Sequence, residues 1–286
     1  MTTKAKVHDW QNSHGKKWSN KIDDIEKMLE PFNEPIIQAL ELEKPTRIAD
    51  IGCGGGRTAL AIARLAPAGS TVDGYDISQD LINIGQKRIP ATGDTKVTFS
   101  CADMQREPAP KIKYDRLASR FGIMFFENPR EAFANLYGWL RVSDSGEIGK
   151  FVFSAWASPE KNPWMVSVHK TVAKYVDMPP NEEDAPGPFR YADKDKLLKL
   201  LKEAGFTNCD TTQWQHKMIL GSGFDSAGAA DFALSSFSTF QEMLEEAGAG
   251  AYDRAKEDLI SYFQDHEVDG IVKMDANVHI FKGTTS

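Results

Sequence analysis

A cluster of glycines at residues 50–56, in the stretch Asp50-Ile-Gly-Cys-Gly-Gly-Gly56, lies directly between a predicted strand and a predicted helix. The short apolar run 47–51 leads into it, and a helical pattern of apolar residues covers 58–65. Glycines at this place let the backbone turn sharply and approach a ligand that a Cβ would exclude. The following helix offers unpaired N–H groups at its N-terminus. The stretch therefore predicts a ligand-binding loop at the end of a strand.

The segments around this loop alternate between strand-like and helix-like patterns. Further strands are predicted at 71–76, 96–102, 114–120 and 150–156, with helices at 79–88 and 129–140. Strands that alternate with helices over 47–156 imply parallel pairing. We therefore expect an open α/β sheet with helices on both faces.

The rest of the chain is less regular. Residues 1–45 are predicted to form an N-terminal helical segment that covers the site, and 46–286 to form one domain. Within that domain we expect insertions at about 157–192, a stretch with six prolines, and at about 222–270, which is mostly helical. The helical stretch 225–264 either covers a ligand pocket, packs on the sheet or forms the surface of a homodimer.

Two acids lie at the ends of the second and third predicted strands, as the glycine loop does at the end of the first. Asp76 ends the second strand 26 positions after Asp50, where a carboxylate accepts hydrogen bonds from the ribose hydroxyls of an adenosine. Asp103 and Met104 follow the third strand. A carboxylate there suits the exocyclic amine of adenine and a sulfur suits its ring; the alternative is that Asp103 only caps a helix. These residues together indicate a ligand that contains adenosine.

The order and spacing of four stretches resemble class I S-adenosylmethionine-dependent methyltransferases. The resemblance is greatest to small-molecule enzymes of the ubiquinone/menaquinone-biosynthesis group. The matching stretches are 48–56, 72–78, 101–104 and 114–126. The resemblance implies a Rossmann-like, seven-stranded, mostly parallel sheet whose last strand is antiparallel, here predicted at Asn277–Lys282.

The resemblance also implies S-adenosyl-L-methionine as the cofactor and assigns parts of it to residues. Asp50 and the glycines would face the methionine part, Asp76 the ribose, and Asp103 with Met104 the adenine. The cofactor-binding residues expected in this way are Trp18, Asp50, Gly52, Cys53, Gly54, Gly56, Asp76, Ile77, Asp103, Met104 and Ser119.

Methyl transfer from a sulfonium is a direct in-line displacement, so alignment of the reactants matters most. A general base is needed only when the nucleophile is protonated at neutral pH. His14, between Trp10 and Trp18, and His169, on a helix of the first insertion, are the catalytic candidates. The alternatives are a solvated His14 between packed tryptophans, and an ordinary surface histidine at 169.

The candidates for binding the methyl acceptor are one cation and several aromatic residues. Arg120, at the end of the fourth strand, binds either a substrate carboxylate or a local acid such as Glu127. The aromatic rings either stabilise a sulfonium through their faces or belong to the core. The substrate-binding residues expected are Arg120, Phe121, Phe125, Trp156 and Trp164.

Composition narrows the class of partner. A net charge of −7, from 41 acidic and 34 basic residues, argues against nucleic acid. The three cysteines, at 53, 101 and 209, form no disulfide framework and no Cys/His metal motif, which favours a metal-free protein in the reducing cytoplasm. No apolar run of about 18 residues indicates a membrane span.

These observations predict an enzyme that transfers a methyl group from S-adenosylmethionine to a small organic acceptor with an O, N, C or S nucleophile. One alternative is a protein that binds S-adenosylmethionine or a nucleotide without catalysis. A less favoured one is an NAD(P)-dependent oxidoreductase, because Arg57 occupies the place of the third glycine of the Gly-x-Gly-x-x-Gly pattern.

Overall fold

The computed structural model of the chain describes residues 10, 13–142, 148–178, 184–236, 239–248 and 250–285. Residues 13 and 14 are described by their backbone only.

Five parallel strands form the part of the sheet that contains the glycine loop. They are β1 (Arg47–Ile51), β2 (Thr71–Asp76), β3 (Lys96–Cys101), β4 (Arg116–Arg120) and β5 (Lys150–Trp156). The order across the sheet is β3-β2-β1-β4-β5-β8-β6. Because the chain moves outward from β1 in both directions, the carboxyl ends of β1 and β4 meet at the middle of one edge. The predicted Rossmann-like α/β fold is confirmed.

Two long antiparallel strands complete the sheet. β8 (Ile271–Thr284) is antiparallel to both β5 and β6 (Thr207–Ile219), and the two-residue β7 (Glu267–Val268) pairs with the start of β8. The predicted antiparallel last strand is therefore confirmed, and it is longer than the expected Asn277–Lys282. Trp156, the last residue of β5, pairs with Val278, so the first part of β8 continues past β5 in company with β6.

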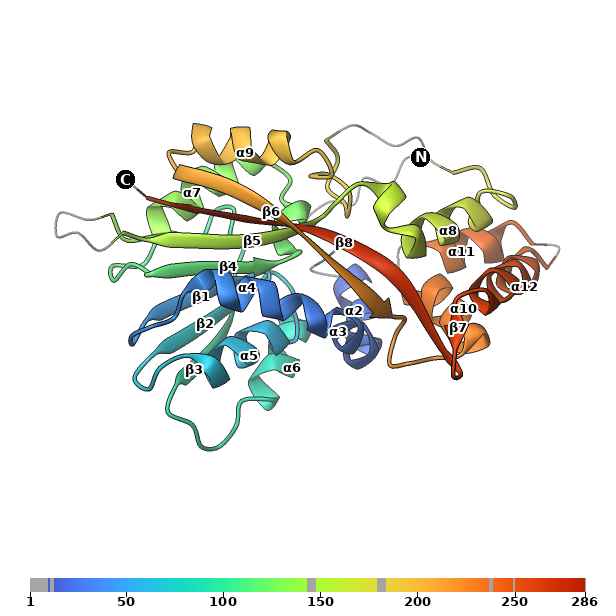
Figure 1. Cartoon of the computed structure of the whole chain (residues 1–286), viewed down its shortest axis with the longest axis horizontal. Helices are drawn as coiled ribbons and strands as arrows, with labels where there is room; N and C mark the ends of the chain where they lie inside the picture. Colours follow the sequence, from blue (N-terminus) through green and yellow to red (C-terminus); the bar gives the residue numbers. More distant parts are fainter. Residues whose placement is uncertain are drawn as a thin grey trace.

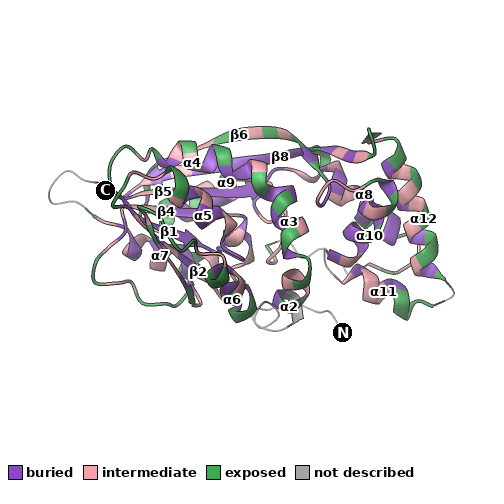
Figure 2. Ribbon diagram, turned by 90° about the horizontal axis from the view of Figure 1, so that it is seen from below, coloured by how far each residue is buried: buried purple, intermediate pink, exposed green. Residues whose placement is uncertain are grey.

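Helices cover both faces of the sheet (Figure 1). On one face lie α4 (Asn33–Leu40), α5 (Arg57–Leu65) and α6 (Gln79–Lys87), and on the other α7 (Pro129–Trp139) and α9 (Lys194–Glu203). The start of α7 follows local chemistry: Pro129 occupies the first turn, and the Asn128 side chain accepts a hydrogen bond from the Glu131 N–H. The sheet between the helices is largely buried (Figure 2).

The N-terminal helices and the cap helices lie beyond the carboxyl edge of the parallel strands (Figures 1 and 2). The N-terminal group is α2 (Ser13–Asn20), α3 (Ile22–Leu29) and the 3-10 turn η1 (Glu30–Phe32). The cap, into which β6 and β8 extend, comprises α8 (Pro163–Val172), α10 (Ser226–Ser236), α11 (Phe240–Glu246) and α12 (Ala251–Gln264). Two further 3-10 turns are η2 (Gly122–Phe125) and η3 (Pro159–Lys161). Among the described residues, none of the helices combines the length and apolar character that crossing a membrane requires.

Candidate functional site

The glycine loop is held in place by the end of β2. The Gly52 and Cys53 N–H groups both donate to the Tyr75 carbonyl, at 2.8 and 3.0 Å, and the Gly54 N–H donates to Asp76 Oδ2 at 2.9 Å. Gly52, Gly54 and Gly56 all have positive φ, at 68°, 55° and 85°. This left-handed conformation disfavours residues with a Cβ, which explains the glycine-rich sequence.

The loop is packed at its two ends and open in the middle. A Cβ on Gly52 would lie 2.8 Å from the Gly122 Cα, and one on Gly56 would lie 2.4 Å from the ring of Phe99. By contrast, no atom of the described residues lies within 4 Å of the place where a Cβ on Gly54 would stand. The open space therefore begins at Gly54, beside the end of β1.

Asp76 lies beside this space with its carboxylate already oriented by the backbone. Its Oδ1 accepts from the Ser78 N–H and its Oδ2 from the Gly54 N–H, both at 2.9 Å. Burial raises the pKa of Asp76, and these backbone donors act in the opposite direction. Each oxygen keeps a lone pair for a further donor.

Asp50 is the most unusual acid of the site. It is 1% exposed, and neither of its carboxylate oxygens makes a hydrogen bond of ordinary geometry with the described residues, although the Ala59 N–H lies near enough to lower its pKa. Burial raises its pKa to about 7, the guanidinium of Arg120 opposes that rise, and the charge of Asp76 adds to it. A buried carboxylate without ordinary hydrogen bonds is costly, so its presence points to a missing cationic or hydrogen-bonding group.

Arg120 shares a face of the sheet with Asp50. Asp50 of β1 lies opposite Ala118 of β4, so their side chains are on the same face of the sheet. Arg120 follows Ala118 by two residues in β4, and its side chain is therefore on that face as well. The Arg120 Nη1 donates to the Leu29 carbonyl at 2.9 Å. Glu26 and Asp50 are the acids whose charge acts on it most strongly. Arg120 therefore joins the N-terminal helices to the end of β4.

A buried ion-pair network that the sequence did not reveal connects α3 to the glycine loop. Glu26, 2% exposed, lies 2.5 Å from Arg88 Nη1 and 3.5 Å from Arg57 Nε. The same Arg88 nitrogen donates to the Gly55 carbonyl at 2.8 Å. One signal was available: Glu26 lies on the apolar stripe of α3, one helical turn after Ile22, where a charged residue needs a buried partner.

The residues after β3 make both local and long-range contacts. Asp103 Oδ1 accepts from the Gln105 N–H at 3.1 Å and its Oδ2 lies 3.5 Å from Arg106 Nη1, so this carboxylate organises its own turn. Met104 is buried, and its carbonyl accepts from the Asn135 side chain at 3.0 Å. The turn thus lies at the same edge as Asp76, which ends the neighbouring strand.

Ser119 is placed differently from the other predicted cofactor residues. It is fully buried, and its hydroxyl donates to the Ile51 carbonyl at 2.6 Å. Ser119 neighbours Ala118 in sequence, so its side chain points to the face of the sheet opposite Asp50. Cys53 is buried as well, which raises the pKa of its thiol, while Ile77 is half-buried directly after Asp76.

Residues 48–143 match the model of a family described as a methyltransferase domain. This range contains the glycine loop and the acids at the ends of β1 and β2. Over these residues the chain is thus similar to methyltransferases.

Characterised methyltransferases share parts of the sequence of this domain. The chain is 28% identical over 97 residues to methyltransferase GfsG of Streptomyces halstedii, which covers 34% of each protein. It is 26% identical over 174 residues to the ubiquinone/menaquinone biosynthesis C-methyltransferase UbiE of Bordetella parapertussis, covering 56% of this chain and 67% of that protein. The chain thus spans about a third of the length of the first relative and two thirds of the second.

The likeness in fold extends over more of the chain. The structure of magnesium protoporphyrin IX methyltransferase from Synechocystis PCC 6803, with bound SAH, has a TM-score of 0.55 and 13% sequence identity, with 98% of both chains covered. At this identity the likeness concerns the fold.

The aromatic residues predicted to bind substrate fall into two separate groups. Phe121 stacks on Trp156, with ring centres 4.3 Å apart, and Trp164 meets Trp156 edge-on at 5.2 Å. Phe32 of the N-terminal segment packs edge-on against both Phe121 and Trp156. All four are buried, so this group is a packed cluster joining the sheet, η1 and α8.

The second aromatic group lies at the N-terminal helices. Trp10 meets Trp18 at 5.5 Å and Phe125 at 5.0 Å, both edge-on. Trp18 and Phe125 are half-buried. Trp10, in contact with Trp18 of α2, is therefore packed against η2, next to the end of β4.

The two catalytic candidates differ in what the structure shows of them. His14 lies in α2, but its side chain is outside the described residues. His169 is exposed on α8, with its ring edge-on to Phe240 of α11 at 6.3 Å. Its contact with Phe240 belongs to the cap and involves none of the strand-end residues.

Polar contacts tie the N-terminal helices to the cap. Lys17 of α2 forms an ion pair with Glu242 of α11. Ser222, in the turn after β6, accepts a hydrogen bond from Lys27 through its carbonyl at 3.1 Å and donates one to Asp24 through its hydroxyl. These contacts span the region above the carboxyl ends of the strands.

A Tyr-x-x-x-Lys spacing, known from some NAD(P)-dependent oxidoreductases, occurs in this chain at Tyr252 and Lys256 of α12. Lys256 Nζ lies 2.8 Å from Asp231 Oδ1 of α10. This pair therefore belongs to the packing of the cap helices and not to the glycine loop.

Proposed function

We propose that this chain binds S-adenosylmethionine at the carboxyl edge of β1, β2 and β3 and transfers its methyl group to a small organic acceptor. The similarity to methyltransferases at 48–143 and the sequence relatives support this proposal. The observation that carries it is the buried Asp50 carboxylate, which makes no hydrogen bond of ordinary geometry with the described residues, together with the open space at Gly54.

The chemistry of these residues fits the methionine part of the cofactor. An ammonium group of the ligand would donate hydrogen bonds to Asp50 and add a positive charge to that of Arg120. Gly54 leaves the backbone bare at this place, so the ligand approaches closely. The expected effect of binding is that Asp50 becomes fully ionised, since a cation beside a carboxylate lowers its pKa.

The acids at the next strands fit the nucleoside part. Asp76, fixed by the Gly54 and Ser78 N–H groups, has lone pairs left for two ribose hydroxyls. We assign Asp103 and Met104 to the adenine, because they follow β3 directly. Ile77 and Cys53 line the same edge, and Ser119 supports the loop from the opposite face through the Ile51 carbonyl.

Catalysis in this site rests on alignment. When bound, the cofactor supplies an electrophilic methyl group on a sulfonium, and the protein must hold that methyl in line with the acceptor. Positioning of this kind accounts for on the order of 7–11 kcal/mol of rate acceleration. The rigid loop and the Glu26–Arg88 network hold the donor side, while Arg120, beside Asp50, is suited to an anionic acceptor.

The acceptor is proposed to be small because helices enclose the site. We assign its cover to the N-terminal helices α2 and α3 and to the cap helices α8, α10, α11 and α12, which are joined through Lys17 and Glu242. The net charge of −7 disfavours nucleic acid as the acceptor. His14 is retained as a candidate base, and a homodimer through 225–264 remains part of the proposal to be tested.

Calorimetric titration with S-adenosylhomocysteine, with NADH in parallel, tests the proposal. We expect saturable binding of the first ligand and none of the second. Asp50→Asn should weaken binding by about 10–100-fold, the effect of losing a charged hydrogen-bond partner. Asp80→Asn, an exposed acid in the first turn of α6, is the matched control and should bind like the parent protein. Binding of NADH alone would overturn the proposal.

A further inference from the structure

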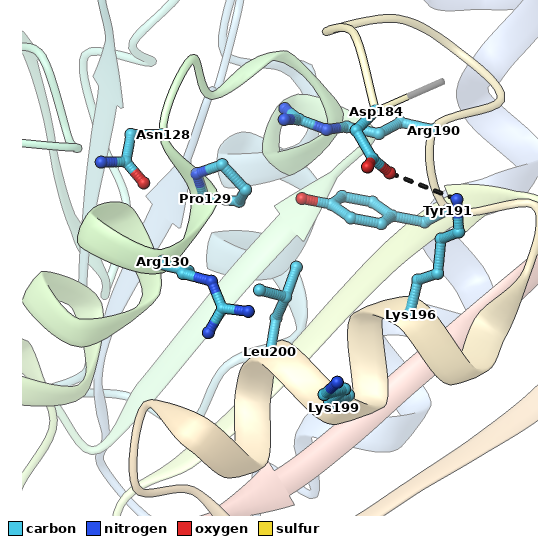
Figure 3. A pocket seen from close by; sticks show the side chains of 9 residues that line it. All are labelled: Asn128, Pro129, Arg130, Asp184, Arg190, Tyr191, Lys196, Lys199 and Leu200. Carbon is cyan, nitrogen blue, oxygen red and sulfur yellow. Dashed lines mark hydrogen bonds and ion pairs between the residues drawn. The ribbon is translucent and has the colours of Figure 1, made fainter.

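A second pocket lies between the start of α7 and α9 (Figure 3). Its volume is about 380 Å³, enough for a small organic molecule. It is lined by Asn128, Pro129, Arg130, Asp184, Arg190, Tyr191, Lys196, Lys199 and Leu200. Neither the methyl donor nor the cover described above uses these residues.

The lining is strongly cationic in a chain whose net charge is negative. Among the described residues that line it, four are cations and one, Asp184, is an acid. Two of the cations are neutralised, because Arg130 pairs with Glu203 and Lys196 lies 3.2 Å from Asp184. That leaves Arg190 and Lys199, for neither of which the described residues provide an ion-pair partner.

Arg190 is fixed at the pocket without losing its charge. Its Nη1 donates to the Phe126 carbonyl, and its guanidinium carbon lies 5.8 Å from the ring centre of Tyr191. Lys199 is exposed on α9 and free to turn toward the pocket. Two uncompensated cations at one pocket favour a ligand with a double negative charge.

Tyr191 adds a donor at the floor of the pocket. The residue is 1% exposed, and its hydroxyl has no hydrogen-bond partner among the described residues. In Figure 3 this hydroxyl points toward Pro129, between the residues that line the pocket. Burial raises the pKa of Tyr191 to about 12, so the hydroxyl keeps its proton. A buried donor without an acceptor is unfavourable, which indicates a ligand acceptor here.

We propose that this pocket binds the phosphate group of a small phosphate monoester, held by the Tyr191 hydroxyl, Arg190 and Lys199. The N-terminus of α7, an 11-residue helix that begins at Pro129, adds its positive end to the same pocket. The volume exceeds that of a phosphate ion alone, so the organic part of the ligand occupies the rest.

The experiment is a calorimetric titration of the full chain with inorganic phosphate and glycerol phosphate at constant ionic strength, with acetate for comparison. It is carried out with saturating S-adenosylhomocysteine, so that the glycine loop is occupied. We expect the phosphates to bind and acetate to bind at least about 10-fold more weakly, because it carries a single charge.

Two variants and a matched control decide whether the binding is at this pocket. Tyr191→Phe removes only an unpartnered hydroxyl, so it should leave the stability of the ligand-free protein unchanged or raised and weaken phosphate binding about 10-fold. Lys199→Gln should weaken it as well, whereas Lys202→Gln, on the same helix but outside the pocket, should not. The proposal would be overturned if the parent protein showed no saturable phosphate binding. It would also be overturned if Tyr191→Phe and Lys199→Gln bound phosphate as tightly as the control Lys202→Gln.

Discussion

Gly52 and Gly122 face each other where the ends of β1 and β4 meet, so closely that a Cβ on Gly52 would lie 2.8 Å from the Gly122 Cα. A Cβ on Gly122 would in turn lie 2.7 Å from the Ile51 carbonyl oxygen. The two loops that follow these strands therefore depend on each other for their shape. Gly54, two residues further on, has no such neighbour.

This contrast predicts different outcomes for two glycine substitutions. Gly52→Ala should destabilise the fold, since a left-handed backbone costs about 1–2 kcal/mol and the overlap adds about 1–3 kcal/mol. Gly54→Ala should cost only the backbone contribution while strongly weakening binding of S-adenosylhomocysteine. Urea denaturation and calorimetric titration measure the two effects. Equal loss of stability in both variants would contradict the packing argument.

Asp50→Asn should make the ligand-free protein more stable. The pKa of Asp50 is raised from 3.8 to about 7, so the folded state binds more protons than the unfolded state between these values. Ionisation of this residue therefore lowers the free energy of unfolding as pH rises from about 4 to 7, by about 1.4 kcal/mol for each pH unit in that range. The neutral amide avoids that loss. Thermal unfolding at pH 8 should show a higher melting temperature for the variant, and a lower one would contradict the assignment.

Binding of S-adenosylhomocysteine should depend on pH in the same range. A ligand ammonium requires ionised Asp50, whose pKa without ligand is about 7. Affinity for S-adenosylhomocysteine should therefore rise toward pH 7, by up to about tenfold per pH unit, and level off above it. Titrations between about pH 5.5 and 8 check this. In Asp50→Asn the profile should be flat, and a flat profile in the parent protein would exclude Asp50 as the ammonium partner.

Asp76→Asn should weaken S-adenosylhomocysteine binding by about 1.5–3 kcal/mol, or about 10–100-fold. The amide keeps only one acceptor oxygen, so its NH₂ group must face either the Gly54 or the Ser78 N–H. Calorimetric titration gives the affinity, and urea denaturation shows separately how much the loop is destabilised. Unchanged affinity would mean that Asp76 does not bind the ribose.

Glu26→Gln should destabilise the chain by about 3–5 kcal/mol, as expected for a broken buried ion pair. Asp23→Asn is a close control, because Asp23 pairs with the same Arg88, also at 2.5 Å, but its side chain is 81% exposed. That variant should lose no more than about 1 kcal/mol. Urea denaturation compares the two. Similar losses would show that burial of Glu26 is not what matters.

The sheet could be predicted well where strands are short, apolar and bounded by turns. The expected ranges 47–51 and 150–156 match β1 and β5. The last strand was predicted at 277–282 but begins at Ile271. Residues 271–276 extend past β5 and pair only with β7, at 271 and 272, and with β6, from 273 onward. Asp275 is exposed there, so this part lacks the continuous apolar character that marks a buried strand.

The site could be predicted only where its residues are close in sequence. The glycine loop and Asp76 follow from strand ends, because parallel strands bring their carboxyl ends together. The Glu26–Arg88 pair joins residues 62 positions apart, and no local pattern specifies such a partner. For the same reason, the sequence does not show that Phe121 and Trp156 belong to one aromatic group and Trp18 and Phe125 to another.

The antiparallel pairing of β6 with β8 brings together the two ends of the segment that contains α10, α11 and α12. Ile219, at the end of β6, pairs with Lys273 near the start of β8, so the segment between them leaves and returns at one place. A segment with adjacent ends tolerates exchange, shortening or growth without disturbing the register of the remaining strands. Under the function proposed above, residues 220–272 could therefore be exchanged to change the acceptor without altering the glycine loop that is assigned to the methyl donor.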